Sequence, residues 1–211
     1  MNGPLSPSRL LLFNLVLLVA STGFGFGDCL DPSPTIAAGR DPYAAIVPRD
    51  LSPAEHATLK ALLLKLDGEW QGTATSRDCR SLNDPGAYRQ YVYTAQAEAE
   101  TDRYGNLYLR KTLYSLERRT TYQENFRLYL TDQRLRINAS SAAGDIEWIE
   151  LGQSRIAFLY RLLLQSKTGP GSTRKEVFIT LEAGELAFTL EQRIYSQGRL
   201  STYSMQRFTR R

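Results

Sequence analysis

The sequence predicts a mainly β protein, an antiparallel up-and-down barrel of about eight to ten strands preceded by a short helix near the N-terminus. Three observations support this fold class. From residue 69 to the C-terminus, apolar and polar residues alternate with a period of two, in segments rich in Tyr, Thr, Leu, Ile and Phe. Seven of the nine prolines lie at or before Pro53, and the other two, Pro85 and Pro170, lie beside glycine in turns. The links between the alternating segments are short, and short links permit only antiparallel pairing.

The first 27 residues have the character of a secretory signal peptide. Residues 10–20 form an apolar run that follows the single charge of Arg9. This run is too short to span a bilayer comfortably, which needs about 20 residues, but it suits the apolar region of a secretory signal. Small residues after the run offer cleavage points after Gly23 or Gly27, and we favour the second. The prediction is therefore an exported protein of the bacterial envelope type, periplasmic or secreted; an uncleaved membrane anchor is the alternative.

Residues 28–51 are predicted to form an extended, proline-rich arm. Cys29 and Cys79 are the only two cysteines of the chain. In an oxidising compartment an even cysteine count favours a disulfide, and this one would join the arm to the domain that follows. Two free thiols are the alternative. Lipidation of Cys29 is disfavoured by the acidic Asp28 before it, where lipidated bacterial signals carry a small neutral residue.

One helix is predicted directly after the arm. Ser52 is a suitable N-cap, Pro53 fits the first helical position, and Glu55 completes a capping box. Leucines then recur at helical spacing, and the residues 67–68, Asp-Gly, end the helix. The predicted apolar face comprises Leu59, Leu62, Leu63 and Leu66.

Ten strands are predicted between this helix and the C-terminus, so that residues 52–211 form one helix-plus-barrel domain. A single meander of this length twists too strongly to stay open, and closing it into a barrel removes the exposed edges. An open antiparallel β-sandwich is the alternative. The predicted strands are 69–77, 88–100, 106–117, 121–131, 134–139, 145–151, 155–165, 174–182, 185–195 and 199–209.

The composition disfavours several function classes. The chain has 26 Lys+Arg against 22 Asp+Glu, and no run of basic residues is longer than two, so we expect no nucleic-acid partner. The single histidine, His56, has no second histidine or Cys-x-x-Cys motif to complete a metal site, so neither a metal nor a cofactor is expected. The carboxylate pairs fit solvent-facing strand positions. No catalytic residue is therefore assigned, and binding is favoured over catalysis.

The segment Gly68-Glu69-Trp70 resembles the opening of calycin barrels, the lipocalin and fatty-acid-binding families. In those families a short helix leads into a Gly-x-Trp on the first strand. The tryptophan closes one end of the barrel, and an arginine from near the last strand packs over it. The resemblance implies that Trp70 and Arg207 form this closure, with Arg193 as a substitute for the arginine. It also implies a lipocalin-like barrel that binds a small apolar or amphipathic ligand without catalysis.

Aromatic residues on the predicted inner face are the candidate ligand contacts. The second strand places Tyr91 and Tyr93 on the same face as a row of alanines, and bulky residues followed by small ones leave room for a ligand. Two alternatives stay open: a filled barrel that serves as an envelope interaction or assembly protein, and a barrel enzyme with a polar Tyr/Glu/Arg site. The predicted ligand-binding residues are Tyr91, Tyr93, Phe126 and Phe158.

Overall fold

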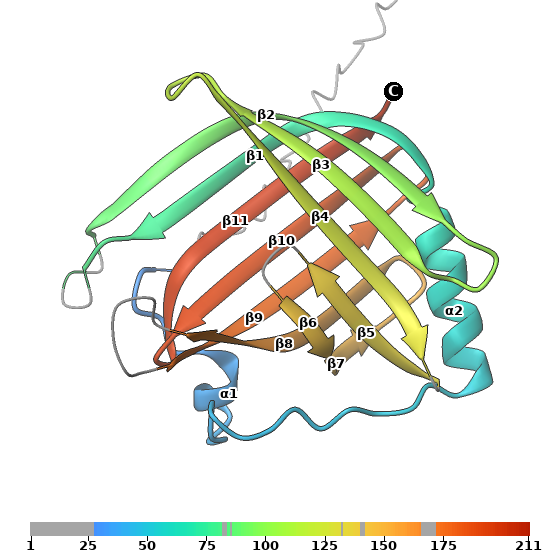
Figure 1. Cartoon of the computed structure of the whole chain (residues 1–211), viewed down its shortest axis with the longest axis horizontal. Helices are drawn as coiled ribbons and strands as arrows, with labels where there is room; N and C mark the ends of the chain where they lie inside the picture. The colour runs from blue at the N-terminus through green and yellow to red at the C-terminus, as the bar shows by residue number, and fades with distance from the viewer. Residues whose placement is uncertain (1–27, 82–83, 85, 132, 140–141, 166–171) are drawn as a thin grey trace, which may run out of the picture.

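Eleven antiparallel strands within the described residues form one sheet, which curves into a nearly closed barrel (Figure 1). The computed structural model describes residues 28–81, 84, 86–131, 133–139, 142–165 and 172–211. The predicted signal peptide, residues 1–27, lies outside the described residues. The mainly β, antiparallel fold class is confirmed, and the strand count exceeds the predicted range.

Two short helices precede the strands. They are α1 (Pro34–Ala37) and α2 (Pro53–Leu64), and neither of these described helices is long and apolar enough to cross a membrane. The strands are β1 (Gly68–Cys79), β2 (Tyr88–Thr101), β3 (Leu107–Ser115), β4 (Thr120–Thr131), β5 (Arg134–Ala139), β6 (Ala142–Asp145), β7 (Glu147–Leu151), β8 (Arg155–Gln165), β9 (Ser172–Ala183), β10 (Ala187–Ser196) and β11 (Arg199–Arg210).

Pairing between the first and the last strand closes the barrel. The strand order is β6-β5-β4-β3-β2-β1-β11-β10-β9-β8-β7, so β1 pairs with both β2 and β11. Nine residue pairs, from Trp70 with Arg210 to Asp78 with Thr202, join β1 to β11. The same order leaves β6 and β7 as the two edges of the sheet.

The predicted strand 145–151 is wrong in one respect, because the structure divides this region between β6 and β7. β6 pairs with β5, whereas β7 pairs with β8. Between them, Ile146 is 1% exposed and belongs to the core. The chain therefore passes from one sheet edge to the other at Ile146. The apolar alternation continues across this residue, so the sequence pattern does not reveal the break.

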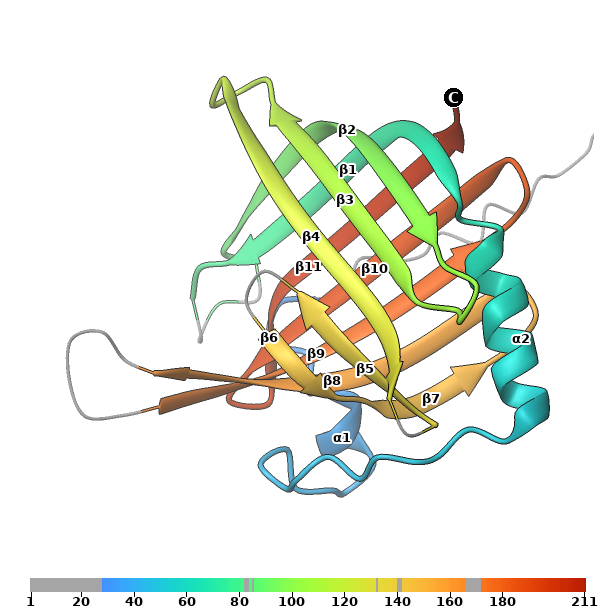
Figure 2. The same cartoon turned by 45° about the vertical axis from the view of Figure 1, so that its right-hand side comes forward.

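α2 begins with the predicted capping box and covers one end of the barrel (Figure 2). The Ser52 hydroxyl accepts a hydrogen bond from the Glu55 N–H at 3.3 Å, and the Glu55 carboxylate accepts one from the Ser52 N–H at 2.9 Å. The bond from the Ser52 backbone, aided by Arg49, lowers the pKa of Glu55 to about 2. The predicted apolar face is confirmed, since the side chains that are buried against the core are Leu59, Leu62, Leu63 and Leu66.

The arm contains a short helix, α1, which the prediction of an extended arm missed. Ser33 caps α1, because its hydroxyl accepts a hydrogen bond from the Ile36 N–H at 3.3 Å. The Ser33 N–H in turn donates to the carbonyl of Gly198 at 2.8 Å, and Pro32 forms a β-bridge with Arg199. The beginning of the arm is therefore attached to the turn between β10 and β11.

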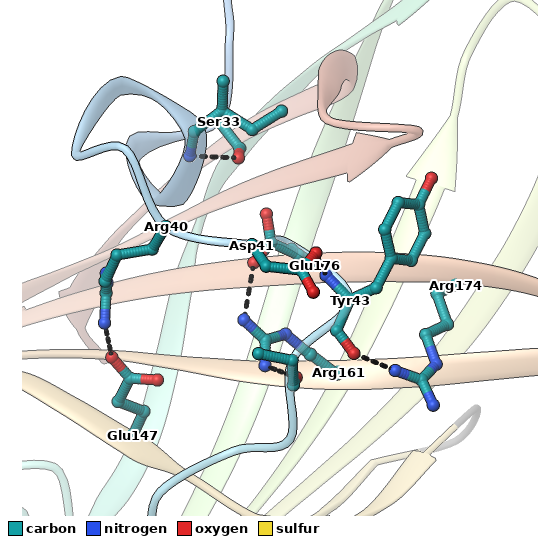
Figure 3. A network of polar contacts seen from close by, with 10 residues as sticks. Ser33, Arg40, Asp41, Tyr43, Glu147, Arg161, Arg174 and Glu176 are labelled. Carbon is teal, nitrogen blue, oxygen red and sulfur yellow. Dashed lines mark hydrogen bonds and ion pairs between the residues drawn. The ribbon is translucent and has the colours of Figure 1, made fainter.

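The arm also covers an apolar patch on the outer face of β8 to β11. Ile46 of the arm packs against this patch. The guanidinium of Arg161, on β8, donates to the backbone carbonyl of Ala44. That of Arg174, on β9, donates to the carbonyl of Tyr43 (Figure 3). The patch consists of Leu159, Phe178, Tyr195, Leu200, Tyr203 and Met205.

A buried ion pair lies beneath the arm. Arg161 and Glu176 are cross-strand partners on β8 and β9, and their side chains meet at 3.1 Å with only 11% and 4% exposure (Figure 3). Arg40 of the arm forms a second ion pair with Glu147 on β7. The arm thus attaches to the barrel through charged groups as well as through apolar contacts.

The predicted disulfide between Cys29 and Cys79 is confirmed. The Cα atoms of the two residues are 5.6 Å apart, and 50 positions of sequence separate them. Because Cys79 is the last residue of β1, the bond joins the start of the arm to the barrel wall.

Replacing both Cys29 and Cys79 with serine is expected to reduce the free energy of unfolding by about 4 kcal/mol, because the unfolded chain loses the constraint of a long loop. The far-UV circular dichroism spectrum should keep its β character, since the sheet does not depend on the arm for its pairing. Urea denaturation of the oxidised wild type and the double variant measures the difference. Equal denaturation midpoints would contradict this stabilising role.

Candidate functional site

The four predicted ligand-binding residues lie on inward-facing positions, but in two separate places. Phe126 and Phe158 are 6% and 0% exposed, and their rings stack with centroids 6.4 Å apart. Tyr91 and Tyr93 are 6.5 Å apart near the ends of the hairpins opposite α2. The structure therefore brings these residues together as a phenylalanine pair and a tyrosine pair rather than as one cluster.

Trp70 fills the end of the barrel that α2 covers. Its side chain is 1% exposed, and its indole N–H donates to the Leu66 carbonyl at 2.7 Å. Phe188 meets the indole edge at 4.9 Å, and Phe208 stacks on Phe188 at 4.5 Å. A buried Trp whose N–H has a partner is a favourable core residue. This end of the barrel is thus packed and closed.

The arginine over Trp70 is Arg210, which corrects the expectation of Arg207. Arg210 is the cross-strand partner of Trp70, and its guanidinium lies 4.6 Å from the indole centroid. Arg207 lies three residues earlier, an odd number, so its side chain points to the opposite, outer face, opposite Thr73. Arg193, the substitute, lies over the Tyr203 ring at 5.8 Å and not over the indole.

Arg210 also connects three parts of the closed end. Its guanidinium donates to the carbonyls of Lys65 and Asp67, both at 3.1 Å, directly after α2. It donates to the carbonyl of Glu185, between β9 and β10, at 3.0 Å. One planar fork thereby satisfies three backbone acceptors while stacking on an indole.

A cavity of about 240 Å³ lies inside the barrel, away from the Trp70 closure. Of the four predicted ligand-binding residues, Phe126 lines it. Strands from both halves of the sheet contribute to the wall, so closure by β1 and β11 creates the cavity. The larger apolar side chains of the wall are Phe126, Ile179, Leu190 and Ile194.

Lys111 places a buried positive charge in the wall of this cavity. Its side chain is 5% exposed, and its ammonium contacts the Glu124 carboxylate at 2.7 Å. The ammonium also donates to the side-chain oxygen of Gln206 at 3.1 Å, and Gln206 itself is 2% exposed. An ammonium has three donors. Two are therefore paired with these protein groups, and one stays available for a further acceptor.

Glu124 is the more exposed partner, because the sheet covers it less. Its side chain is 44% exposed, against 5% for Lys111. The described pairing of β4 with β5 reaches only to Phe126, opposite Ala139, and Glu124 lies beyond this point. The cavity therefore meets solvent beside Glu124.

Tyr160 and Gln192 add hydrogen-bonding groups to the opposite wall. Burial raises the pKa of Tyr160 to about 12, although a hydrogen bond with Gln192 acts in the other direction. The phenol therefore stays protonated at physiological pH and offers a neutral hydrogen-bonding group rather than a general base.

Lys111, Glu124 and Gln206 are not among the candidate site residues that the sequence predicts. The signal that could have found Lys111 is its position between Leu109 and Leu113, on the apolar, inward-facing register of β3. A charged residue at an inward position is expensive unless it is paired. A lysine at an inward position of a strand is therefore a candidate functional residue. A lysine at the neighbouring position would point outward into solvent.

His56 lies on α2 and faces the turn between β2 and β3. Its Nε2 atom lies 3.3 Å from the carbonyl oxygen of Tyr104, and it borders a hollow of about 280 Å³ with Leu51 and Leu130. Among the residues that the structure describes, no group of three or more His, Cys, Asp or Glu side chains is placed to hold a metal ion.

No protein-family model matches the chain, and no curated protein matches it. Among solved structures it is similar to Rv2717c from M. tuberculosis, with 14% identity, a TM-score of 0.47 and coverage of 77% of this chain and 99% of that chain. It is also similar to the S-type phycobiliprotein lyase CPES from Guillardia theta, with 12% identity, a TM-score of 0.48 and coverage of 77% and 98%. A DUF3598-family protein of unknown function from Nostoc punctiforme shares 12% identity and a TM-score of 0.40, with coverage of 78% and 51%. Similarities this low carry no argument about function.

Replacing Arg210 with alanine is expected to reduce the free energy of unfolding by about 1 to 2 kcal/mol, because partly exposed charge-assisted hydrogen bonds and the indole contact are lost together. The matched control is Arg207→Ala on the same strand, which should change stability by less than about 0.5 kcal/mol. Urea denaturation followed by tryptophan fluorescence measures both. A larger loss in the Arg207 variant would show that Arg210 is not the closing residue.

Proposed function

We propose that the protein is exported and that its barrel binds one small amphipathic molecule, without catalysing a reaction on it. The observation that carries this proposal is the buried ammonium of Lys111 in the wall of a cavity that combines apolar side chains with the polar groups of Glu124, Tyr160 and Gln192. The proposed ligand places its apolar body against the cavity wall and a hydrogen-bond acceptor on Lys111.

The cost of burying Lys111 supports a binding role. A lysine in a barrel interior needs partners to offset the loss of hydration, and an apolar residue of similar volume commonly gives equal or greater stability. Glu124 and Gln206 use two of its donors and leave the third for an acceptor from the ligand. Such a group fixes ligand orientation, while the apolar wall supplies most of the contact area.

The size of the cavity limits the ligand. A volume of about 240 Å³ corresponds to about eight water molecules at their share of liquid volume, which suits a medium-chain amphiphile. Phe126 would contact the chain directly, with Phe158 stacked behind it. Tyr91 and Tyr93 are proposed as contacts at the end opposite α2, where a ligand would approach.

Two observations favour this function over the alternatives. A cavity with a polar group disfavours a completely filled barrel whose only role is assembly. For the enzyme alternative, Tyr160 is the buried tyrosine of the cavity, and its raised pKa makes it a poor base. The disulfide between Cys29 and Cys79 supports export, because disulfides persist in oxidising compartments.

Octanoate and octanol, titrated calorimetrically into the mature chain, test this function. Both should bind saturably, octanoate more tightly because its carboxylate meets an ammonium. Lys111→Met should weaken octanoate binding by about tenfold or more, the value of one charge-assisted hydrogen bond, and should affect octanol less. Lys60→Met, which changes a lysine on α2, is the control and should change neither. Absence of saturable binding of both probes would refute the proposal.

A further inference from the structure

Positive charge gathers at the end of the barrel opposite α2. The β1–β2, β3–β4, β8–β9 and β10–β11 hairpins end there, and the start of the arm lies beside the β10–β11 turn (Figure 1, Figure 2). The described ends of these hairpins and the start of the arm carry eight basic residues, which we name the hairpin rim, against five acidic residues, Asp28, Asp31, Asp78, Asp84 and Glu117. The buried Arg161–Glu176 pair is internally neutral. The hairpin rim consists of Arg77, Arg80, Arg89, Arg118, Arg119, Arg174, Lys175 and Arg199.

The other end of the barrel shows no such excess. It is made by α2 with its flanking residues from Arg49 to Trp70, by the β2–β3, β4–β5, β7–β8 and β9–β10 turns, and by the C-terminus. Its charged residues are eight basic, Arg49, Lys60, Lys65, Arg103, Arg134, Arg155, Arg210 and Arg211, and eight acidic, Asp50, Glu55, Asp67, Glu69, Asp102, Glu150, Glu182 and Glu185. Charge is therefore distributed unevenly between the two ends of the barrel, and the hairpin rim is the positive end.

Apolar side chains are exposed among these arginines. Leu116, at the end of the β3–β4 hairpin, is 69% exposed, and Val92 and Tyr88 on β2 are 57% and 43% exposed. Exposed leucine and tyrosine beside arginine are the residue types that enter the boundary between lipid headgroups and acyl chains. The α2 end also exposes apolar side chains, with Leu186, Tyr104 and Leu64 at 74%, 59% and 48% exposure, so the basic charge is what distinguishes the rim.

Contacts between side chains hold part of the rim in shape. Arg77 stacks on Tyr88 at 4.0 Å, and Arg118 stacks on Tyr91 at 4.2 Å. An ion pair of 2.7 Å between Arg89 and Glu117 joins the β1–β2 hairpin to the β3–β4 hairpin. Arg80 and Arg119 are exposed beside these contacts. The positive surface is thus partly preorganised.

We infer that the hairpin rim docks on a lipid bilayer that contains anionic phospholipid. Charge complementarity favours this partner, because a negatively charged headgroup layer attracts basic side chains within about one Debye length of its surface. Leu116 and Tyr88 would then contact the interfacial region. The docked molecule keeps α2 away from the membrane, with the hairpin ends facing it. This inference stands independently of the ligand proposed for the cavity.

Cosedimentation of the mature chain with phosphatidylcholine vesicles, with and without phosphatidylglycerol, tests this docking. The chain should bind the vesicles that contain phosphatidylglycerol, with binding that falls as salt rises, and should not bind phosphatidylcholine alone. Arg80→Glu combined with Arg119→Glu should weaken binding at least tenfold. The matched control is Lys60→Glu combined with Arg103→Glu at the opposite end, which makes the same charge change and should alter binding less than twofold.

Three results would overturn the inference. The first is absence of binding to vesicles that contain phosphatidylglycerol. The second is an equal loss of vesicle binding in the rim variant and the control variant, which would mean that net charge alone causes the attraction. The third comes from Leu116→Ser, which should weaken vesicle binding about threefold without changing its salt dependence; unchanged binding would exclude contact of the hairpin end with the bilayer. Circular dichroism verifies that the variants, all altered at surface positions, are folded.

Discussion

The pairing of β1 with β11 is the constraint on which the rest of the structure depends. It turns a meander into a barrel and so creates an inside, where Gln206 of β11 reaches Lys111 of β3. The same register places Arg210 beside Trp70 and closes one end. Without this pairing the strands would form two separate sheets, β1 to β6 and β7 to β11, each with its apolar face in water.

The sheet has an inner and an outer apolar surface, and different parts of the chain cover them. The inner surface is buried by closure and by α2. The outer surface of β8 to β11 carries a second apolar patch, which closure leaves exposed, and the arm covers it with Ile46 while Arg161 and Arg174 hold its backbone. The disulfide keeps this cover attached at its N-terminal end. The arm is therefore a structural part of the domain, although no strand of the barrel lies in it.

The sequence predicts the features whose signals are local. It does not predict the features that depend on the register between strands that are distant in the chain. Capping residues and alternation lie within a few positions of each other, so α2 and most strands were predictable. Arg207 and Arg210 are equally basic and lie on one strand, and only the β1–β11 register shows which one faces Trp70. The break at Ile146 and the polar site at Lys111 depend likewise on which strands meet across the barrel. Local patterns do not contain this information.

The lengths of the strands explain why the polar site lies where it does. β4 extends past the described end of its pairing with β5, so Glu124 lies at a place where the barrel wall is incomplete. Its partner Lys111 belongs to β3, which β2 and β4 cover on both sides. One charge of the pair is therefore hydrated and the other is not. A pair fully inside the wall would lose the hydration of both charges, and a pair fully outside would be screened by water. The incomplete wall permits a buried ammonium to face a cavity at modest energetic cost.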